Sequence, residues 1–477
     1  MDQTKPHVLF IPYPAQSHIK CMLKLARLLN HRGFNITFVT TQTNHKRLIK
    51  SSGTCWLNDT PNFQFKTVPD GTSATDDDAE QTQNTVEIWT YIEANFYDSF
   101  LDVMANLETP VTCIVCDGFM TYTNIMNATE KLNIPIILFW TMAACGFMGF
   151  YQVKVLKEKG LVPLKDDSAL TDEYLDMEVD WIPGMEGTRL RDLPEFTRYA
   201  KPEHDPALKF LLKTAQAADK VSYIIIHTFK ELEARLVKGM KSIFPNIYTI
   251  GPLQLHLNQI KEVETENSDS IGYSLWKEEP ECVQWLESKE PNSVVHVNFG
   301  SIAVMSLQDL VEFGWGLVNS NVYFLWIIRT DLVDGEPAVL PQELKEAMKE
   351  KGFVASWCSQ EEVLNHPAVG GFLTHGGWGS IIESLSSGVP MICWPVSGDQ
   401  LTNCRQMCTE WEVGLELAKN VKRGDVEARV RALMEGAEGE RMRKKAMEWK
   451  KTAETTVVHD GSSWLDLEKL VDLIISL

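Results

Sequence analysis

The sequence predicts an α/β protein made of two doubly wound halves that are joined by a linker. Short apolar runs alternate with amphipathic stretches in both halves, which is typical of strands that alternate with helices. The runs are continuously apolar, as expected for the strands of a parallel sheet that helices cover on both faces. A polar, acidic stretch separates the halves, and at 477 residues the chain is long enough for two domains with full cores.

The N-terminal half begins with a strand, a helix and a second strand. A short apolar run over 7–13 predicts the first strand, an apolar-periodic stretch to about His31 predicts the helix, and Gly33 precedes the second strand. The second and later strands of this half are predicted over 34–41, 111–117, 135–141 and 223–229. We assign residues 1–252 to an N-terminal domain.

The C-terminal half repeats this alternation after an acidic linker over 253–277. A helix is predicted from about Ser306, and the strands are predicted over 293–301, 323–329, 353–357, 369–375 and 389–395. We assign 278–455 to a C-terminal domain and 456–477 to a turn and an amphipathic helix. Because the carboxyl ends of parallel strands lie at one edge of a sheet, we expect a ligand in a cleft between the two halves.

Composition and charge exclude several classes of protein. The 45 Lys and Arg residues against 65 Asp and Glu residues give a net charge of −20, so nucleic acid and anionic membrane surfaces should be repelled. No segment predicts a membrane span or a secretory signal, and the ten cysteines then fit reduced thiols in a cytoplasmic protein. We interpret the lone CxxC at Cys113 and Cys116 as core, and the D-x-D within Asp76 to Asp78 as a solvated loop, so no metal site is expected.

The segment 369–395 has the pattern of an anion site. A strand ends at His375, a turn with three glycines follows, and Ser380 opens a helix that Gly388 closes. Glycines let the backbone approach a phosphate, while the N–H groups and the positive dipole at the start of a helix favour a diphosphate. The turn after an earlier strand places Gly300 and Ser301 where they could donate to the same anion.

Two more residues extend this site toward a nucleotide. Glu383 lies one turn into the same helix, where it could accept hydrogen bonds from both hydroxyls of a ribose. Trp357 ends a strand, and its indole could stack on a nucleobase. Together with the glycine turn, these residues predict binding positions for a base, a ribose and a diphosphate, in that order.

The 44 residues from Trp357 to Gln400, WCSQEEVLNHPAVGGFLTHGGWGSIIESLSSGVPMICWPVSGDQ, resemble the signature box of plant UDP-dependent glycosyltransferases. The similarity extends across nearly the whole chain, through FIPYPAQSHIKCMLKLARLL, HTFKELE, YTIGPL and EPECVQWLESKEPNSVVHVNFGS. The segments GFMGFYQ, VDWIPGMEG, EFGWGL, YFLWIIR and DQLTNCR look closest to the family-85 branch and its steviol-type terpenoid glucosyltransferases. The resemblance implies a GT-B architecture, in which two Rossmann-like domains face each other across a cleft, the N-terminal one binding the acceptor and the last helix packing back on it.

The resemblance also implies roles for the matching residues of the donor site. Trp357 would stack on the uracil, Gln360 would contact the uridine and Glu383 would hold the ribose. The diphosphate would be bound by His375, Gly377, Ser380 and Ser301. The sugar would be held by Trp378, Asp399, Gln400 and Thr141. Two further residues, Cys358 and Gly379, would complete the donor site. The final Gln of the box is associated with glucose donors, so UDP-glucose is the expected co-substrate and no cofactor is expected.

Three positions depart from the pattern of the family. Gly376 stands where the family usually has Cys. Gly379 stands where many members have Asn, and this glycine variant resembles the family-85 pattern. Gly398 replaces a bulkier residue of near relatives, at a position close to the sugar or acceptor contact.

The N-terminal half holds a candidate catalytic base. The segment PAQSH places His18 at the start of the first helix, and Asp117 ends the strand 111–117, so both should lie at one edge of the sheet. A carboxylate bonded to one imidazole nitrogen fixes the tautomer and raises the basicity of the other nitrogen. These two residues match the catalytic dyad of the family. The resemblance therefore implies an inverting displacement without a metal ion, in which His18 deprotonates a hydroxyl of the acceptor. A carboxyl of the acceptor is the other group to which the glucose could be transferred.

The acceptor pocket is expected to come from loops of the N-terminal half. The candidate residues are mostly apolar and aromatic: Tyr13, Phe119, Trp140, Met142, Phe147 and the segment 181–186. Such a lining suits a small lipophilic acceptor, and the resemblance suggests a diterpenoid or another terpenoid. A monomer is expected.

Several alternatives remain open from the sequence. A nicotinamide-dependent oxidoreductase would need a G-x-G-x-x-G turn after the first strand, where this chain has PYPAQSH. A non-catalytic sensor of nucleotide sugars would have no need for His18 paired with Asp117. Among enzymes, the alternatives are a cyanohydrin, cytokinin, flavonoid or monoterpenol acceptor, or another UDP-sugar as donor.

Overall fold

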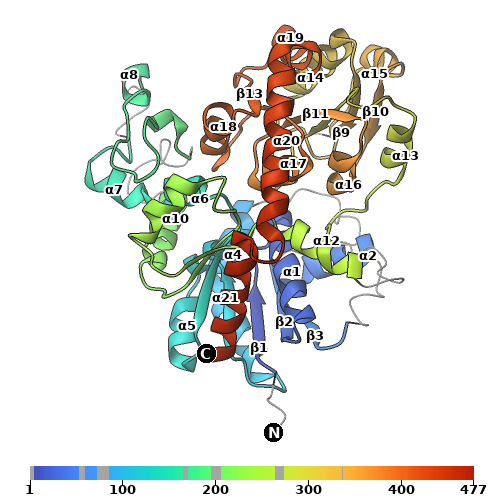
Figure 1. Cartoon of the computed structure of the whole chain (residues 1–477). Coiled ribbons are helices and arrows are strands. Elements are labelled where there is room, and N and C mark those ends of the chain that lie inside the picture. The colour runs from blue at the N-terminus through green and yellow to red at the C-terminus, as the bar shows by residue number, and fades with distance from the viewer. Residues whose placement is uncertain are drawn as a thin grey trace. The chain divides into compact units, whose positions relative to one another are not determined.

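The computed structural model describes residues 5–52, 60–71, 85–164, 170–194, 206–263, 273–335 and 337–477. The chain divides into two compact units (Figure 1). Among the described residues, the first unit contains those up to Trp276 together with Thr455–Leu477, and the second unit contains Lys277–Glu454. The chain returns from the second unit to the first within the long helix α20 (Ala437–Val457).

The described residues of the first unit form a seven-stranded parallel sheet. Its strands are β1 (His7–Ile11), β2 (Asn35–Thr41), β3 (Phe63–Val68), β4 (Cys113–Asp117), β5 (Ile136–Trp140), β6 (Ile224–Ile226) and β7 (Ile247–Thr249). Their order is β3-β2-β1-β4-β5-β6-β7, so β1 lies between β2 and β4. The order reverses between β1 and β4, and in open α/β sheets ligands bind at the carboxyl ends of the strands beside such a reversal.

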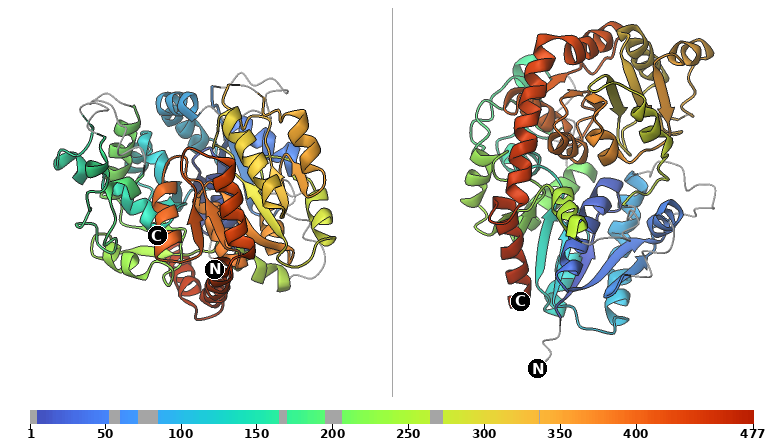
Figure 2. Two further views of the ribbon diagram at one scale, coloured as in Figure 1. Left: turned by 90° about the horizontal axis from the view of Figure 1, so that it is seen from above. Right: turned by 45° about the vertical axis from the view of Figure 1, so that its right-hand side comes forward.

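Helices cover this sheet on both faces, as Figure 2 shows. The helices of this unit are α1 (Gln16–His31), α2 (Gln42–Ser52), α4 (Thr85–Ala105), the 3₁₀ helix η2 (Gly118–Tyr122), α5 (Ile125–Leu132), α6 (Ala144–Tyr151), α7 (Val153–Glu158), α8 (Asp172–Leu175), η4 (Leu190–Asp192), α10 (Pro206–Ala218), α11 (Ala234–Lys241), α12 (Leu253–Val263) and α21 (Ser462–Ser476). Helix α1 buries an apolar stripe that includes Met22, Leu25 and Leu29 in the same core as Leu470 of α21. The last helix of the chain therefore belongs to the core of the first unit.

The second unit is built in the same way around a six-stranded parallel sheet. Its strands are β8 (Val294–Asn298), β9 (Tyr323–Ile327), β10 (Gly352–Ala355), β11 (Val369–Thr374), β12 (Met391–Cys393) and β13 (Gly414–Glu416), in the order β10-β9-β8-β11-β12-β13. Its helices are α13 (Glu281–Glu287), α14 (Leu307–Ser320), α15 (Gln342–Met348), α16 (Gln360–Asn365), α17 (Trp378–Ser387), α18 (Gln400–Thr409) and α19 (Arg423–Glu435), followed by α20. The strand order reverses between β8 and β11, which places a second ligand-binding edge at their carboxyl ends.

The structure differs from the sequence prediction in three places. Strands β3, β7 and β13 were not predicted, because only the first and last residues of β3 are buried and the other two strands have only three residues each. The predicted linker begins with helix α12, whose Leu253 and Leu257 lie in the core of the first unit. Helix α17 begins at Trp378, two residues before the predicted start.

The cysteines and aspartates that the sequence analysis considered as metal ligands can now be located. Cys113 and Cys116 are buried free thiols of β4, and burial raises the pKa of Cys113 to about 12. The D-x-D of Asp76 to Asp78 lies outside the described residues. In the part of the chain that the structure describes, no group of three or more His, Cys, Asp or Glu side chains could hold a metal ion.

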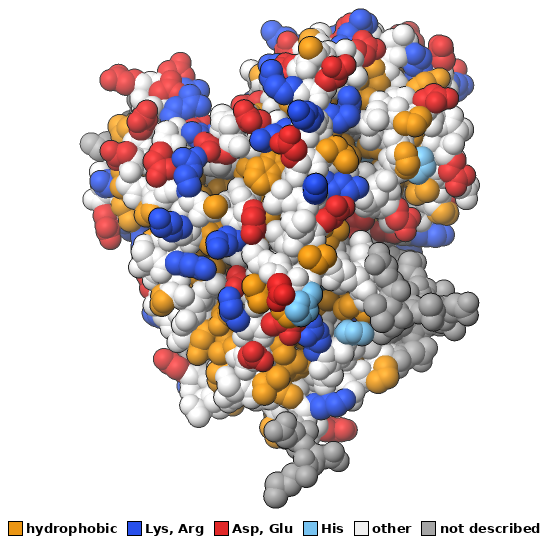
Figure 3. Space-filling view, viewed as in Figure 1, with side chains coloured by type: hydrophobic (Ala, Val, Ile, Leu, Met, Phe, Trp, Pro, Cys, Tyr) orange, Lys and Arg blue, Asp and Glu red, His pale blue; other side chains and the backbone are white. Residues whose placement is uncertain are grey.

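The same described ranges contain no helix with the length and apolar character needed to cross a bilayer. On the face seen in Figure 3, positive and negative side chains are interspersed rather than gathered by sign.

A buried histidine predicts how stability depends on pH. His296 in β8 is fully buried and stacks on Phe372, with the ring centroids 4.9 Å apart. Burial lowers its pKa from 6.5 to about 4, so between these values the unfolded chain takes up a proton that the folded unit does not. The free energy of unfolding should therefore fall as the pH drops, and His296→Phe should remove up to about 3 kcal/mol of that fall.

Urea unfolding at neutral pH and at roughly pH 4.5 measures this difference. The same replacement at His459, whose side chain is 77% exposed, serves as the control and should leave the pH dependence unchanged. An equal pH dependence in the wild type and in His296→Phe would show that His296 does not titrate in this range.

Candidate functional site

The structure brings His18 and Asp117 together at the carboxyl end of the first sheet. His18 lies in the first turn of α1, which directly follows β1, and Asp117 is the last residue of the neighbouring β4. The distance between His18 Nδ1 and Asp117 Oδ2 is 2.7 Å. The Asp117 side chain is 1% exposed and that of His18 is 15% exposed, so the pair is sheltered while the imidazole keeps access to solvent.

A second hydrogen bond holds the Asp117 carboxylate in place. Its Oδ1 accepts from the backbone N–H of Phe119 at 2.9 Å, because Asp117 caps the start of η2. With one oxygen bound to the backbone, the other is directed at His18. An ionised carboxylate can only accept hydrogen bonds, so Nδ1 of His18 carries the hydrogen that it donates to Asp117. Nε2 then has a free lone pair. This tautomer is the one a general base requires.

Thr141 lies beside this pair. It directly follows β5, and its Oγ1 is 2.9 Å from Nδ1 of His18. The sequence placed Thr141 among the sugar-binding residues, and the structure places it in the first unit with the candidate base.

Glu233 is a residue that sequence reasoning missed. Its carboxylate is buried and accepts from the backbone N–H groups of Ala144 and Cys145 at 2.9 and 2.8 Å, which caps the start of α6 just after Thr141. Burial raises the pKa of Glu233, while its hydrogen bonds oppose that rise. A lone Glu at the end of HTFKELE has no local signal for this role, because the helix that it caps lies almost ninety residues earlier in the chain.

Four of the five acceptor candidates form an aromatic cluster around His18. Phe119 lies at its centre, with ring centroids 5.9 Å from Tyr13, 5.4 Å from His18 and 5.5 Å from Trp140. Trp140 in turn lies 4.8 Å from Phe147. The fifth candidate, Met142, is 5% exposed. Tyr13, Trp140 and Phe147 are 5%, 2% and 1% exposed, so the cluster is largely buried and contacts the base through Tyr13 and Phe119.

Ile182 and Met185 of the segment 181–186 are buried, and Trp181 is half-buried. Lys159 Nζ lies 4.4 Å from the centroid of the Trp181 ring.

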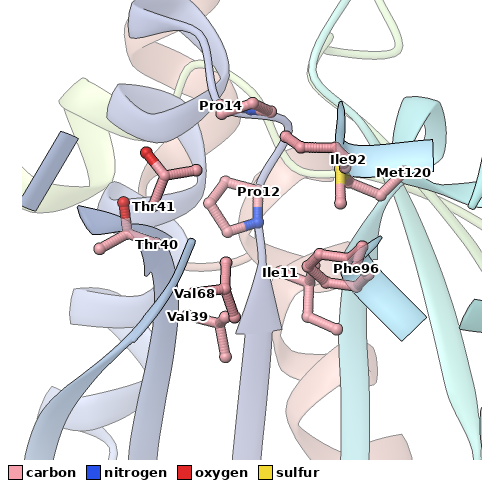
Figure 4. A pocket seen from close by; sticks show the side chains of 10 residues that line it. All are labelled: Ile11, Pro12, Pro14, Val39, Thr40, Thr41, Val68, Ile92, Phe96 and Met120. Carbon is pink, nitrogen blue, oxygen red and sulfur yellow. The ribbon is translucent and has the colours of Figure 1, made fainter. Parts of the chain in front are cut away.

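A small pocket opens near this cluster, and Figure 4 shows the side chains that line it. It lies at the carboxyl ends of β1 and β2, beneath Ile92 and Phe96 of α4. The space that the centre of a water molecule can occupy is about 10 Å³, which suits roughly one water. None of its ten lining residues is an acceptor candidate, although Pro12 and Pro14 flank Tyr13.

In the second unit, the glycine turn ends in the start of a helix. Gly377 is the N-cap of α17, so the N–H groups of Gly379 and Ser380 lie in its first turn, where no carbonyl of the helix can accept from them. The helix dipole adds a positive partial charge at the same end. Together these groups form a site suited to a diphosphate.

His375 lies between this turn and the loop after β8. A Cβ at Gly300 would be 2.5 Å from Cε1 of His375, and one at Gly377 would be 2.4 Å from Nε2, so only glycine lets both backbones approach the ring. Burial, together with the nearby Arg329, lowers the pKa of His375 to about 4. The ring is therefore neutral near pH 7 and carries a single N–H, and a hydrogen bond to the backbone of Asn298 opposes part of the lowering of its pKa.

A chain of hydrogen bonds links the predicted uridine residues. Nε2 of Gln360 donates to Oε2 of Glu383 at 2.8 Å and to Oγ of Ser380 at 3.2 Å. Oε1 of Gln360 accepts from Asn298 at 2.8 Å, and Asn298 Oδ1 accepts from the N–H of Gly300 at 2.9 Å. Asn298 is a second residue that the sequence did not single out, because an Asn at a strand end has no distinctive spacing. It joins the base, ribose and diphosphate parts of the predicted site.

The side chains of the two tryptophans and the cysteine that were predicted to bind the UDP-sugar are buried. Trp357 is 8% exposed, Cys358 is 3% exposed and Trp378 is 4% exposed. The Trp378 ring packs against Trp411, with the centroids 5.9 Å apart, so its backbone N–H is the group best placed for a ligand.

The predicted sugar residues of the second unit gather at the start of α18. Oε1 of Gln400 accepts from the backbone N–H groups of Val396 and Ser397, at 2.8 and 3.0 Å. Asn403 donates to Asp399 Oδ2 at 3.0 Å and to the carbonyl of Gly376 at 3.1 Å. Asn403 therefore ties the sugar residues to the glycine turn, a role that only the tertiary contact reveals.

The structure accounts for the glycine at position 376. Gly376 has φ +82°, and a Cβ there would be 2.5 Å from Sγ of Cys393. Gly376→Cys should therefore strain the backbone and clash with Cys393, lowering the free energy of unfolding by about 2–4 kcal/mol. Adding Cys393→Ala removes the clash but not the strain, so it should recover roughly half of that loss.

Unfolding curves of the single and double variants test this coupling. Gly335 has φ +76° with no atom within 4 Å of an added Cβ, so Gly335→Cys measures the strain alone. If Gly376→Cys were no more destabilising than Gly335→Cys, the contact with Cys393 would not explain the glycine.

Comparison with known proteins gives consistent matches along the chain. A family model described as UDP-glucoronosyl and UDP-glucosyl transferase matches residues 205–451. UDP-glycosyltransferase 85C1 of Stevia rebaudiana is 69% identical over 475 residues, which are 99% of this chain and 98% of that protein. A 7-deoxyloganetin glucosyltransferase of Gardenia jasminoides is 52% identical over 480 residues, which are 99% of this chain and 98% of that protein.

A solved structure matches the fold. The crystal structure of Os79 from O. sativa in complex with UDP has a TM-score of 0.81 and 24% identity, and the match covers 98% of this chain and all of that one. At this identity the match supports the architecture of two parallel-sheet domains.

Proposed function

Since this chain belongs to the UDP-glucosyl transferase family, and is a family-85 plant UDP-glycosyltransferase with the GT-B fold, we propose that it moves glucose from UDP-glucose to a small lipophilic alcohol. The proposed acceptor is a terpenoid, at a hydroxyl or a carboxyl group. His18 is the proposed base, and Asp117 assists it. The observation that supports this mechanism best is the 2.7 Å contact between His18 Nδ1 and Asp117 Oδ2.

The proposed reaction is a single displacement. Nε2 of His18 takes the proton of the acceptor hydroxyl while that oxygen forms a bond to the anomeric carbon of glucose. The bond between this carbon and the diphosphate oxygen breaks, its electron pair leaves with UDP, and the configuration at the anomeric carbon is inverted. Asp117 stabilises the positive charge that develops on His18.

The residues of the second unit support UDP-glucose as the donor. The N–H groups at the start of α17 offer hydrogen bonds to the diphosphate, and Glu383 is held by Gln360 for the ribose. These donors stabilise the charge on the leaving UDP, so we propose that the reaction needs no metal ion. Asp399 and Gln400, which the sequence assigns to the sugar, start the neighbouring helix α18.

The aromatic cluster around His18 supports a lipophilic acceptor. Aromatic rings bind flat or polycyclic apolar molecules through large contact areas. The relative from Gardenia jasminoides is named for a 7-deoxyloganetin acceptor, and the family-85 segments of the sequence favour terpenoids over the cyanohydrin, cytokinin and flavonoid alternatives.

The experiment that tests the proposed function is UDP release by the purified protein, with UDP-glucose and a panel of acceptors. The panel contains a diterpenoid, a monoterpenol, a flavonoid, a cytokinin and a cyanohydrin, each with and without a chelator. We expect release with a terpenoid, undiminished by the chelator. Release with another class alone would replace the proposed acceptor, and loss of activity with the chelator would overturn the metal-free mechanism.

A further inference from the structure

Apart from the partial charge at the start of α17, the predicted donor residues of the second unit supply no positive charge to a diphosphate. Glu383 and Asp399 are acidic, and the other residues of the set are uncharged. His375 is neutral near pH 7, because burial and the nearby Arg329 lower its pKa to about 4. A nucleoside diphosphate nevertheless brings several negative charges, which a low-dielectric site must offset.

Arg329 is a buried cation close to this site. It follows β9 by two residues and is 4% exposed. Its guanidinium donates to the carbonyl of Ala303 at 2.6 Å and also to the carbonyl of Ser301. Both carbonyls belong to the loop after β8, which contributes Ser301 to the predicted diphosphate site.

The loop 299–303 lies between Arg329 and His375. The ring of His375 packs against Gly300, where an added Cβ would be 2.5 Å from Cε1. In a planar trans peptide the N–H points opposite to the carbonyl. Because the carbonyls of Ser301 and Ala303 point at Arg329, the N–H groups of Ile302 and Val304 point away from it. Arg329 thus sets the direction of the N–H groups of Ile302 and Val304.

The charge of Arg329 is only partly neutralised. Its Nε lies 3.6 Å from Oδ1 of Asp331, and among the described residues this nitrogen has no hydrogen-bond partner. A buried charge that lacks full compensation costs stability, and its field is strong where the dielectric constant is low. The cost is offset if an anion binds nearby.

We propose that Arg329 is a positioning residue of the donor site, which orients the loop 299–303 and supplies a fixed positive charge that offsets the diphosphate of the bound nucleotide. The inference rests on the proposed function, because it takes UDP as the ligand of the second unit. It adds the source of the charge, which the glycine turn and the neutral His375 do not provide.

Comparing the binding of UDP with that of uridine distinguishes an electrostatic role of Arg329 from a role in folding. UDP and uridine share the base and the ribose, and only UDP carries the diphosphate. Calorimetric titration of Arg329→Met should show UDP binding weakened roughly tenfold or more, with uridine binding within about twofold of the wild type. Arg329→Lys keeps the charge and should retain most of the UDP affinity. Arg441, whose side chain is 75% exposed, serves as the control, and Arg441→Met should leave both ligands unchanged.

Asp331→Asn tests the role of Arg329 by an expected increase, rather than a decrease, in the affinity for UDP. It removes the carboxylate that partly neutralises Arg329, so UDP should bind about two to five times more tightly while uridine is unaffected. A residue that merely holds the fold would not produce tighter binding. This variant also decides the matter if Arg329→Met does not fold, as judged by circular dichroism.

The outcomes distinguish the two proposals. A wild-type protein that binds no UDP would overturn the proposed donor and, with it, the role of Arg329. If the wild type binds UDP but Asp331→Asn binds it no more tightly, or a folded Arg329→Met loses uridine and UDP equally, only the role of Arg329 is wrong.

Discussion

Replacing His18 with alanine should lower kcat for transfer to an unactivated alcohol by roughly 10²–10⁴-fold, the usual contribution of a general base. The imidazole is held by Asp117 at 2.7 Å, with Nε2 free to take a proton. Without it, the hydroxyl of the acceptor must lose its proton to water while it attacks, which raises the barrier. The measurement is the rate of UDP release under saturation with both substrates.

An acidic phenol as acceptor makes this test specific. A phenol that is already ionised at neutral pH needs no base, so His18→Ala should lose much less activity on it than on an alcohol. His31, the exposed last residue of the same helix, is the matched control, and His31→Ala should keep full activity. Near-normal turnover of an alcohol by His18→Ala would show that another group is the base.

Replacing Glu383 with alanine should weaken the binding of UDP by roughly 100-fold or more. The carboxylate is 6% exposed, and Gln360 donates to one of its oxygens, so its position is fixed before a ligand arrives. Two hydrogen bonds from ribose hydroxyls to a carboxylate contribute roughly 1.5–3 kcal/mol each, and removing the side chain loses most of this free energy. Titration calorimetry with UDP measures the loss directly.

The 2′-deoxy analogue of UDP shows whether the loss comes from the ribose. The wild type should bind 2′-deoxy-UDP more weakly than UDP, while Glu383→Ala should bind the two ligands equally. Glu362, which is exposed on α16, provides the control, and Glu362→Ala should bind as the wild type does. Glu383→Ala that still discriminates between the two nucleotides would place the ribose elsewhere.

The predicted residues fall into two groups according to how far apart they lie in the chain. The turn from β11 into α17 is local, since its strand, glycines and helix follow one another, and its sequence pattern was enough to predict the site. His18 and Asp117 are 99 residues apart. Their meeting was expected because the ends of parallel strands lie at one edge, but their contact depends on β1 and β4 being neighbours in the sheet.

The residues that support these groups were not predicted. Asn298, Asn403, Glu233 and Arg329 are polar and largely buried, and each bonds to a segment distant in sequence. A single Asn, Glu or Arg in an apolar run has no periodicity or spacing that shows its partner. The same reason explains α12, whose polar sequence suggested a linker although two of its leucines pack into the core.

By itself, the sequence determined the α/β class, the strand and helix alternation, the glycine turn and the membership of a family, because these depend on local patterns and on a long shared signature. The tertiary structure decided which strands are neighbours, where Thr141 lies, why position 376 is glycine and which buried polar side chains hold the sites. The physical reason is that a buried polar group must find a hydrogen-bond partner, and the fold alone determines which distant group that partner is.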